Sequence, residues 1–139
     1  MASITGSVAP VDGRMITAKA MLMDNVAPLR MILYSNNYTP VAGSVLASFT
    51  RASFSGYATQ FMAINANQPS LPYPFNTVTF SYAAVPPATP IINQIYGWVI
   101  YDPTKSNVTI MCDKFSAPVT MQAGAGPIRV NADLQATTY

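Results

Sequence analysis

The sequence predicts an all-β protein: a single β-sandwich or jelly-roll-like domain over residues 14–139, with one short N-terminal helix at about 14–24 and an extended N-terminal arm over residues 1–13. Two observations carry this prediction. About seven short segments alternate residue by residue or are rich in β-branched and aromatic side chains. Clusters of Pro, Gly and Asn separate them, which is the pattern of a sandwich and not of alternating strands and helices.

The N-terminal part is predicted from composition and spacing. Gly and Pro punctuate the small polar residues of segment 1–13, which favours an extended chain. In the helix that follows, Met15, Ala18 and Leu22 share one face, and Pro28 stops it. This is the one helix that the sequence predicts.

Three strands are expected next. Leu29–Ser35 is apolar on both of its faces, so we expect it to be buried on both sides. Ala52–Ala63 alternates with little contrast in polarity and is a second candidate. Thr77–Tyr82 alternates cleanly, as in a sheet with one solvent-facing side. Between them, Asn65–Asn76 holds three prolines and is expected to be a long surface loop.

Two hairpins are predicted in the last third of the chain. The segments Gln94–Tyr101 and Val108–Phe115 flank a turn that begins with Asp102 and Pro103. The other hairpin places Pro118–Gln122 against Ile128–Leu134 across the turn Gly124–Gly126. We expect each hairpin to be a pair of neighbouring antiparallel strands.

The charge content excludes some classes of partner. Only 9% of the residues are charged, against roughly 25% in an ordinary soluble domain. The three Lys and four Arg are scattered and form no basic patch, so no nucleic-acid partner is expected. No apolar run approaches the ~20 residues of a membrane span, and the first residues do not resemble a secretory signal. The protein is therefore expected to be made in the cytoplasm and to avoid membranes.

The groups that catalysis needs are scarce. The chain has no His, no Glu and one cysteine, so no cofactor, no metal site and no disulfide is expected. Cys112 lies on the same predicted strand face as Val108 and Ile110, and we interpret it as a small buried hydrophobe. The five Asp residues stand in separate cap-, turn- or strand-like contexts, which favours turn-forming or solvated roles. We therefore expect a protein that is not an enzyme.

The aromatic residues leave two uses open. Tyr57, Phe61, Tyr73, Phe75 and Trp98 would either form a stacking platform for sugar or fill a core or subunit contact. The second use is favoured, because aromatic side chains are enriched at protein interfaces.

One segment carries a family resemblance. Residues 33–60 resemble a pattern of small tailed-bacteriophage virion proteins, in which a strand is followed by three short motifs. A Tyr-Gly-Trp-Val strand at residues 96–99 and a late Phe before Pro-Val-Thr extend the match. The motif residues are Asn36, Asn37, Thr39 and Pro40, then Val45, Leu46, Phe49 and Thr50, then Phe54, Gly56, Tyr57 and Ala58.

The resemblance implies a virion structural protein, and we expect a capsid decoration or cement protein on the capsid surface. Its partners would be the major capsid protein and copies of itself, as a homotrimer or other homo-oligomer. We expect the contacts at Ile4 and Val8 of the arm and at Leu71, Tyr73 and Phe75 of the proline-rich loop. The alternatives are a tail or fibre-tip adhesin that binds host glycan and, from a third class, an aspartate-based hydrolase with two converging carboxylates.

Overall fold

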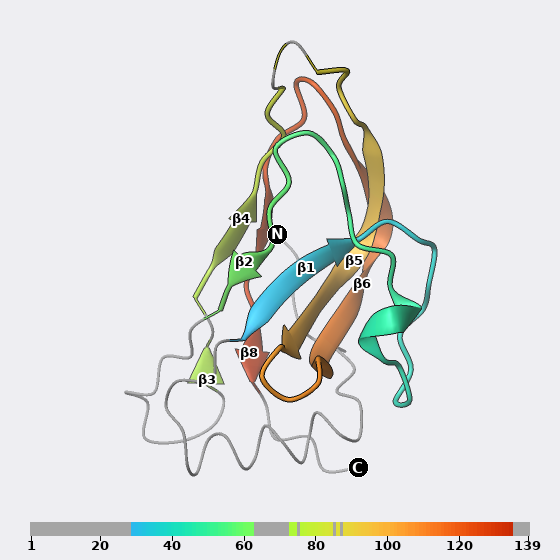
Figure 1. Cartoon of the computed structure of the whole chain (residues 1–139), viewed down its shortest axis with the longest axis vertical. Coiled ribbons are helices and arrows are strands. Elements are labelled where there is room, and N and C mark those ends of the chain that lie inside the picture. The colour runs from blue at the N-terminus through green and yellow to red at the C-terminus, as the bar shows by residue number, and fades with distance from the viewer. Residues whose placement is uncertain (1–28, 63–72, 75, 85, 87, 135–139) are drawn as a thin grey trace.

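The computed structural model describes residues 29–62, 73–74, 76–84, 86 and 88–134 (Figure 1). The predicted all-β class is confirmed, since these residues form strands and a single turn of 3-10 helix. The predicted arm over residues 1–13 and helix at about 14–24 lie outside the described residues. In chain order the elements are β1 (Arg30–Tyr34), η1 (Leu46–Ser48), β2 (Gln60–Phe61), β3 (Tyr73–Pro74), β4 (Val78–Phe80), β5 (Asn93–Asp102), β6 (Val108–Met121), β7 (Ile128–Val130) and β8 (Asp133–Leu134).

The centre of the molecule is a four-stranded antiparallel sheet in the order β2-β1-β5-β6. Strand β1 lies between two neighbours, and its residues 31–34 are all buried. The prediction that Leu29–Ser35 is buried on both sides is therefore confirmed. The absence of alternation in this segment reflects a strand whose two faces both contact apolar side chains.

Strands β5 and β6 form the first predicted hairpin. In the turn between them, Asp102 Oδ1 accepts hydrogen bonds from the backbone N–H of Thr104 at 2.9 Å and from its hydroxyl at 2.6 Å. Ser106 and Asn107 both take left-handed backbone angles, with φ of 55° and 58°. Asn tolerates this conformation better than most residues. The turn-forming role expected for an aspartate is thus confirmed at Asp102.

A bulge in β6 changes which face each of its residues occupies. Ile100 pairs with Met111 and Tyr101 pairs with Thr109, so Ile110 is an extra residue in the ladder. Ile110 and Met111 consequently both contact the larger core, whereas Cys112 contacts the opposite face. The prediction that Cys112 is buried is confirmed, but the prediction that it shares a face with Ile110 is wrong.

The second predicted hairpin is wrong. Residues 118–121 belong to β6 and pair with β5, and β7 pairs instead with β4, through Val78↔Val130 and Phe80↔Ile128. The turn itself is present, since the N–H of Ala125 donates to the carbonyl of Gln122 at 3.0 Å. It leads the chain out of the four-stranded sheet into a different one. A further pair is β3 with β8.

Most of the predicted strand over Ala52–Ala63 is not a strand. Only Gln60 and Phe61 pair, with β1. Gly56 has a φ of +84° within a turn in which the N–H of Tyr57 donates to the carbonyl of Phe54 at 2.9 Å. A side chain at Gly56 would also meet the backbone N of Ala83 at 2.8 Å. The alternation of apolar residues here arises from a turn that packs against the core.

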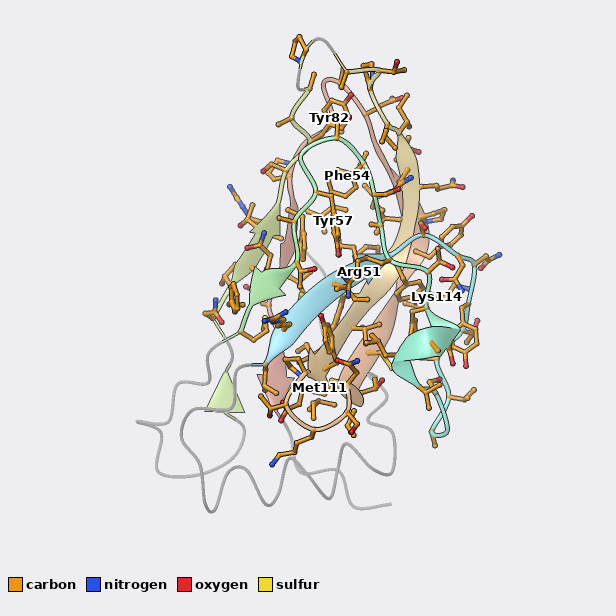
Figure 2. The ribbon with its side chains drawn as sticks, viewed as in Figure 1. Arg51, Phe54, Tyr57, Tyr82, Met111 and Lys114 are labelled. Atoms are coloured by element: carbon orange, nitrogen blue, oxygen red, sulfur yellow. The ribbon has the colours of Figure 1, made fainter. Side chains whose placement is uncertain are left out.

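The buried side chains form two clusters, one on each face of the four-stranded sheet. The larger cluster joins the sheet to β4 and β7, and Figure 2 shows Phe54, Tyr57 and Tyr82 along its upper part. The smaller cluster lies beneath the segment over residues 36–50. Its buried members are Ile32, Tyr34, Phe49, Val99, Tyr101 and Cys112.

Candidate functional site

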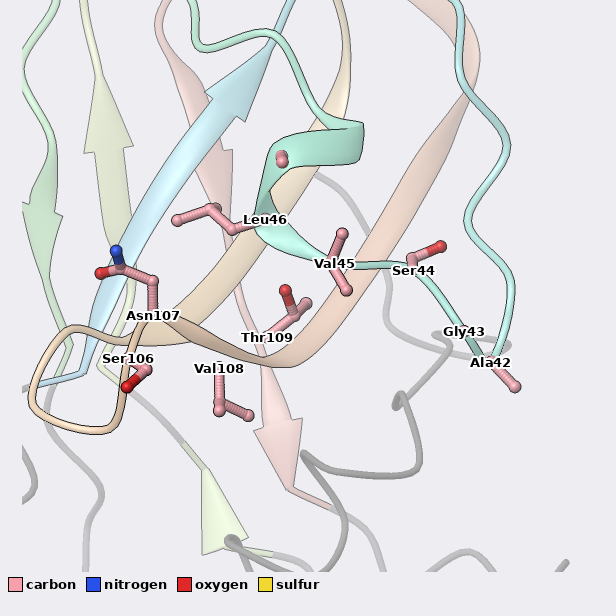
Figure 3. Close-up of a pocket in the computed structure, with 10 residues that line it drawn as sticks. Ala42, Gly43, Ser44, Val45, Leu46, Ser106, Asn107, Val108 and Thr109 are labelled. Carbon is pink, nitrogen blue, oxygen red and sulfur yellow. The ribbon is translucent and has the colours of Figure 1, made fainter.

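The site is a groove of about 710 Å³ between the segment before β2 and the start of β6 (Figure 3). One wall is the loop that leads into η1, and the other is the end of the β5–β6 turn with the first residues of β6. Figure 3 shows the side chains of Leu46 and Thr109 between these walls. The lining residues are Ala42, Gly43, Ser44, Val45, Leu46, Ala47, Ser106, Asn107, Val108 and Thr109.

Asn36 fixes the base of the loop wall. Its side-chain amide donates to the carbonyl of Ser48 at 3.0 Å, and its side-chain oxygen accepts from the N–H of Thr50 at 2.7 Å. Lys114 of β6 adds a second anchor, because its ammonium donates to Asn37 Oδ1 at 2.6 Å and to Thr39 Oγ1 at 3.1 Å. Asn36 thereby joins the two ends of the loop to each other, and Lys114 attaches the loop to β6.

Ser44 sets the shape of the loop itself. Its hydroxyl oxygen accepts from the N–H of Val41 at 2.8 Å and shares a hydrogen bond of 3.0 Å with the hydroxyl of Tyr38. Ser44 is buried, while its neighbour Val45 is 57% exposed. The loop therefore presents an apolar side chain outward at the rim of the groove.

The strand wall contains a polar group without a partner. Thr109 is 4% exposed, and its hydroxyl has no hydrogen-bond partner among the described residues. Arg30, Tyr101 and Thr109 stand side by side on β1, β5 and β6. Arg30 Nε and Asp102 Oδ2 are also buried without a partner in the described part of the chain. This end of the sheet thus concentrates unsatisfied polar atoms.

Among the described residues, no charged side chain lines the groove. None of its ten lining side chains is ionisable. Arg30 lies at the far side of the same sheet end, and its guanidinium carbon is 5.2 Å from the centre of the Phe61 ring. An occupant of the groove would therefore be selected by shape, apolar contact and hydrogen bonding.

Two titratable groups of the smaller cluster, Cys112 and Tyr34, have raised pKa values. Burial raises the pKa of the Cys112 thiol to about 12, and the nearby Asp113 carboxylate adds to the rise. Burial likewise raises the pKa of Tyr34, whose hydroxyl contacts the carbonyl oxygens of Asp113 at 3.2 Å and Tyr38 at 3.3 Å. Among the described residues, no three Cys or Asp side chains gather closely enough to hold a metal ion.

None of the residues predicted to make contacts is among the described residues that line this groove. Ile4, Val8, Leu71 and Phe75 lie outside the described residues. The backbone of Tyr73 pairs with that of Leu134 in the β3–β8 pair. The contacts predicted for these five residues therefore remain predictions.

The aromatic platform considered for sugar is not formed by Trp98 and Tyr57. Trp98 is fully buried in the larger core. Tyr57 stacks on Phe80 with 5.9 Å between ring centres, and its hydroxyl accepts from the N–H of Leu33 at 3.3 Å. Phe61 is 69% exposed, but a single ring under an arginine is not a platform. Trp98 and Tyr57 serve the core, which is the use that the sequence favoured.

The groove itself was missed by sequence reasoning. Its walls come from two segments far apart in the chain, and neither contains a chemically distinctive residue. One available signal was the virion-protein motif, because Val45 and Leu46 of that motif line the groove. No residue of the opposite wall, Ser106–Thr109, belongs to the motif.

Within the part of the chain that the structure describes, no helix is long and apolar enough to span a membrane. Comparisons with protein-family models, curated proteins and solved structures found no match to this chain. The resemblance to small tailed-phage virion proteins therefore rests on the motif residues themselves.

Proposed function

We propose that the chain is a bacteriophage virion structural protein, a capsid decoration or cement protein that binds between major capsid proteins on the outside of the head. It is made in the host cytoplasm and assembles as a homotrimer or other homo-oligomer of β-sandwich, jelly-roll-like subunits. The virion-protein motif over residues 33–60 supports this assignment. It binds by contact and performs no turnover.

The observation that carries the proposal is the exposure of large apolar side chains on a nearly uncharged chain. Val45 is 57% exposed beside the groove, and Ile91 and Ile92 are 50% and 56% exposed just before β5. With 9% charged residues, there is little charge repulsion to keep such positions apart from neighbouring molecules. Burial against other subunits removes this apolar surface from water.

A decoration protein stabilises a shell through repetition. A standard interface buries roughly 1,600 Å² in total, and contacts made by linked subunits at several sites reinforce one another. A homo-oligomer that binds several capsid proteins at once therefore resists their separation more strongly than its single contacts would. This is the mechanism by which internal DNA pressure would be opposed.

The test is to locate the protein in purified particles and in a reconstruction of the intact virion. We expect a regular array of density on the outside of the head, and we expect heads lacking the protein to release DNA at a lower temperature. Density at the tail tip, with loss of host-cell binding on deletion, would support the glycan-binding alternative instead. Abundant protein in the host lysate with none in the particles would overturn the proposal.

A further inference from the structure

We propose that the groove between the loop over residues 42–47 and the start of β6 is the docking site for residues Met1–Pro10 of a second copy of this chain. The inference deepens the proposed function, on which it rests, because it names the contact that builds the homo-oligomer. The occupant is identified by what the groove requires and by what the N-terminal sequence contains.

The first requirement is a strand that can pair. Strand β6 is the last strand of the four-stranded sheet, and no other described strand pairs with its outer edge. Thr109 of β6 faces the loop at Val45 and Leu46 across the groove, whereas the side chain of Val108 points away from that loop (Figure 3). An extended segment lying between these walls would hydrogen-bond to the β6 backbone while its side chains contact both walls, as in other cases of strand addition.

The second requirement is a hydrogen-bonding partner for Thr109. Its hydroxyl is buried and has no partner among the described residues. A buried polar group left unpaired costs about 1–3 kcal/mol, so folded proteins nearly always supply a partner. An occupant with a backbone or hydroxyl group at this position would supply it.

The third requirement is the absence of charge. None of the described side chains that line the groove is ionisable, so a charged occupant would lose its hydration without gaining an ion pair with them. Residues 1–10 of this chain contain no Lys, Arg, Asp or Glu side chain. The groove and this segment therefore match in charge.

The N-terminal sequence also has the period of a strand. Ala2, Ile4 and Val8 alternate with polar residues at positions 3, 5 and 7, so the apolar side chains of an extended segment share one face. The apolar face would pack against Val45 and Leu46, and a hydroxyl on the other face would hydrogen-bond to Thr109. Pro10 limits the paired stretch, because proline has no N–H to donate.

A second copy is the appropriate source, because a trimer needs two different surfaces on each subunit. Head-to-tail contacts between two different surfaces close into a ring when the rotation from one subunit to the next is about 120° for a trimer. The N-terminal segment and the groove are two such surfaces. About 18 residues separate Pro10 from Leu29. When extended, they can span up to about 60 Å, which is enough to reach a neighbouring subunit.

The test is disulfide trapping between two full-length chains of different mass, one carrying Ile4→Cys and the other Val45→Cys. The native Cys112 is fully buried and does not compete. We expect the mixed disulfide to form on the order of 1,000-fold faster than for free chains at micromolar concentration, because docking raises the effective concentration to the millimolar range. In the matched control, the second chain carries Ile92→Cys in place of Val45→Cys. Ile92 is 56% exposed and lies just before β5.

Each result of the trapping experiment either supports or overturns the proposal. Linkage between the two chains at Val45→Cys, but not at Ile92→Cys, supports the proposal. A chain that carries both Ile4→Cys and Val45→Cys and closes only on itself would overturn it, and so would the absence of any linkage. Unchanged Trp98 fluorescence shows that each variant is folded. Since trapping uses the isolated protein, its result is independent of whether the protein is found on virions.

Discussion

On one face of the four-stranded sheet, β4 and β7 pack a broad apolar core that includes Phe80, Trp98 and Val130. On the other face, the segment over residues 36–50 covers a smaller cluster that includes Tyr34 and Phe49. The first cover consists of paired strands, whereas the second is a loop held by side-chain hydrogen bonds from Asn36, Ser44 and Lys114.

This difference separates two tasks. Strand pairing and extensive apolar burial on the first face supply most of the folding free energy, because the hydrophobic contribution grows with buried area. The looped face contributes less burial, but its irregular backbone leaves the groove beside β6 open. Function is commonly carried by loops that a rigid scaffold positions, and here the scaffold is the sheet with its first face.

The largest expected effect is a difference between two buried phenylalanines. Phe80→Ala should lower the free energy of unfolding by about 3–5 kcal/mol, because Phe80 is 2% exposed and paired strands surround the cavity that its loss would leave. Phe49→Ala should cost about 2 kcal/mol less, because the loop above it can collapse into the space. Urea denaturation of both variants measures this difference. Equal costs would contradict the separation of the two faces.

Gly97→Ala should lower the free energy of unfolding by about 3 kcal/mol, which is a smaller effect. A Cβ at Gly97 points toward the looped face, where it would collide with the carbonyl oxygen of Asp113 and lie 2.6 Å from the Tyr34 hydroxyl. Overpacking of this kind typically costs about 1–3 kcal/mol, and here backbone must move. The matched control is Gly126→Ala, where nothing lies within 4 Å and the change should be near zero. A harmless Gly97→Ala in urea denaturation would show that the looped face is loosely packed.

The smallest expected effect is a dependence of stability on alkaline pH. Burial raises the pKa of Cys112 to about 12 in the folded protein, so the thiol stays protonated there while the unfolded chain ionises near pH 9. The free energy of unfolding should therefore be unaffected by this thiol below pH 9 and should fall as the pH rises, by up to about 1.4 kcal/mol per pH unit.

Cys112→Ala is the control for this prediction, because it removes the thiol's contribution to the slope between pH 9 and 10. That window precedes the ionisation of most tyrosines. Identical slopes in urea denaturation of the native chain and the variant would show that the smaller cluster admits water around Cys112.

The parts of the fold that the sequence predicted are those specified by neighbouring residues. Strand β1 and the β5–β6 hairpin follow from local apolar runs and a turn with Asp102 and Asn107. The pairing of β7 with β4 could not be found in this way. The turn at Gly124 fixes where the chain reverses, but the choice of partner for Ile128–Val130 depends on packing across the two layers.

The groove was unpredictable for a related reason. Val45 and Thr109 are ordinary residues for a loop and a strand, and only the fold brings them together. The face of Cys112 illustrates the same limit, because the bulge at Ile110 reverses the alternation that a sequence pattern assumes. Local pattern therefore predicted that Cys112 is buried but not which neighbours it contacts.

The second irregularity of β6 has a consequence for the behaviour of many copies at high concentration. Between the pairs Ile95↔Val119 and Gly97↔Lys114, residues 115–118 of β6 stand opposite the single residue Tyr96. Fibrils grow on long, flat edges that offer every backbone group in register. The bulge and Pro118 interrupt the longest edge of this molecule, so a strand that pairs near Val108 cannot continue along it. A chain with too little charge to prevent aggregation by repulsion is thus protected by the geometry of its edge.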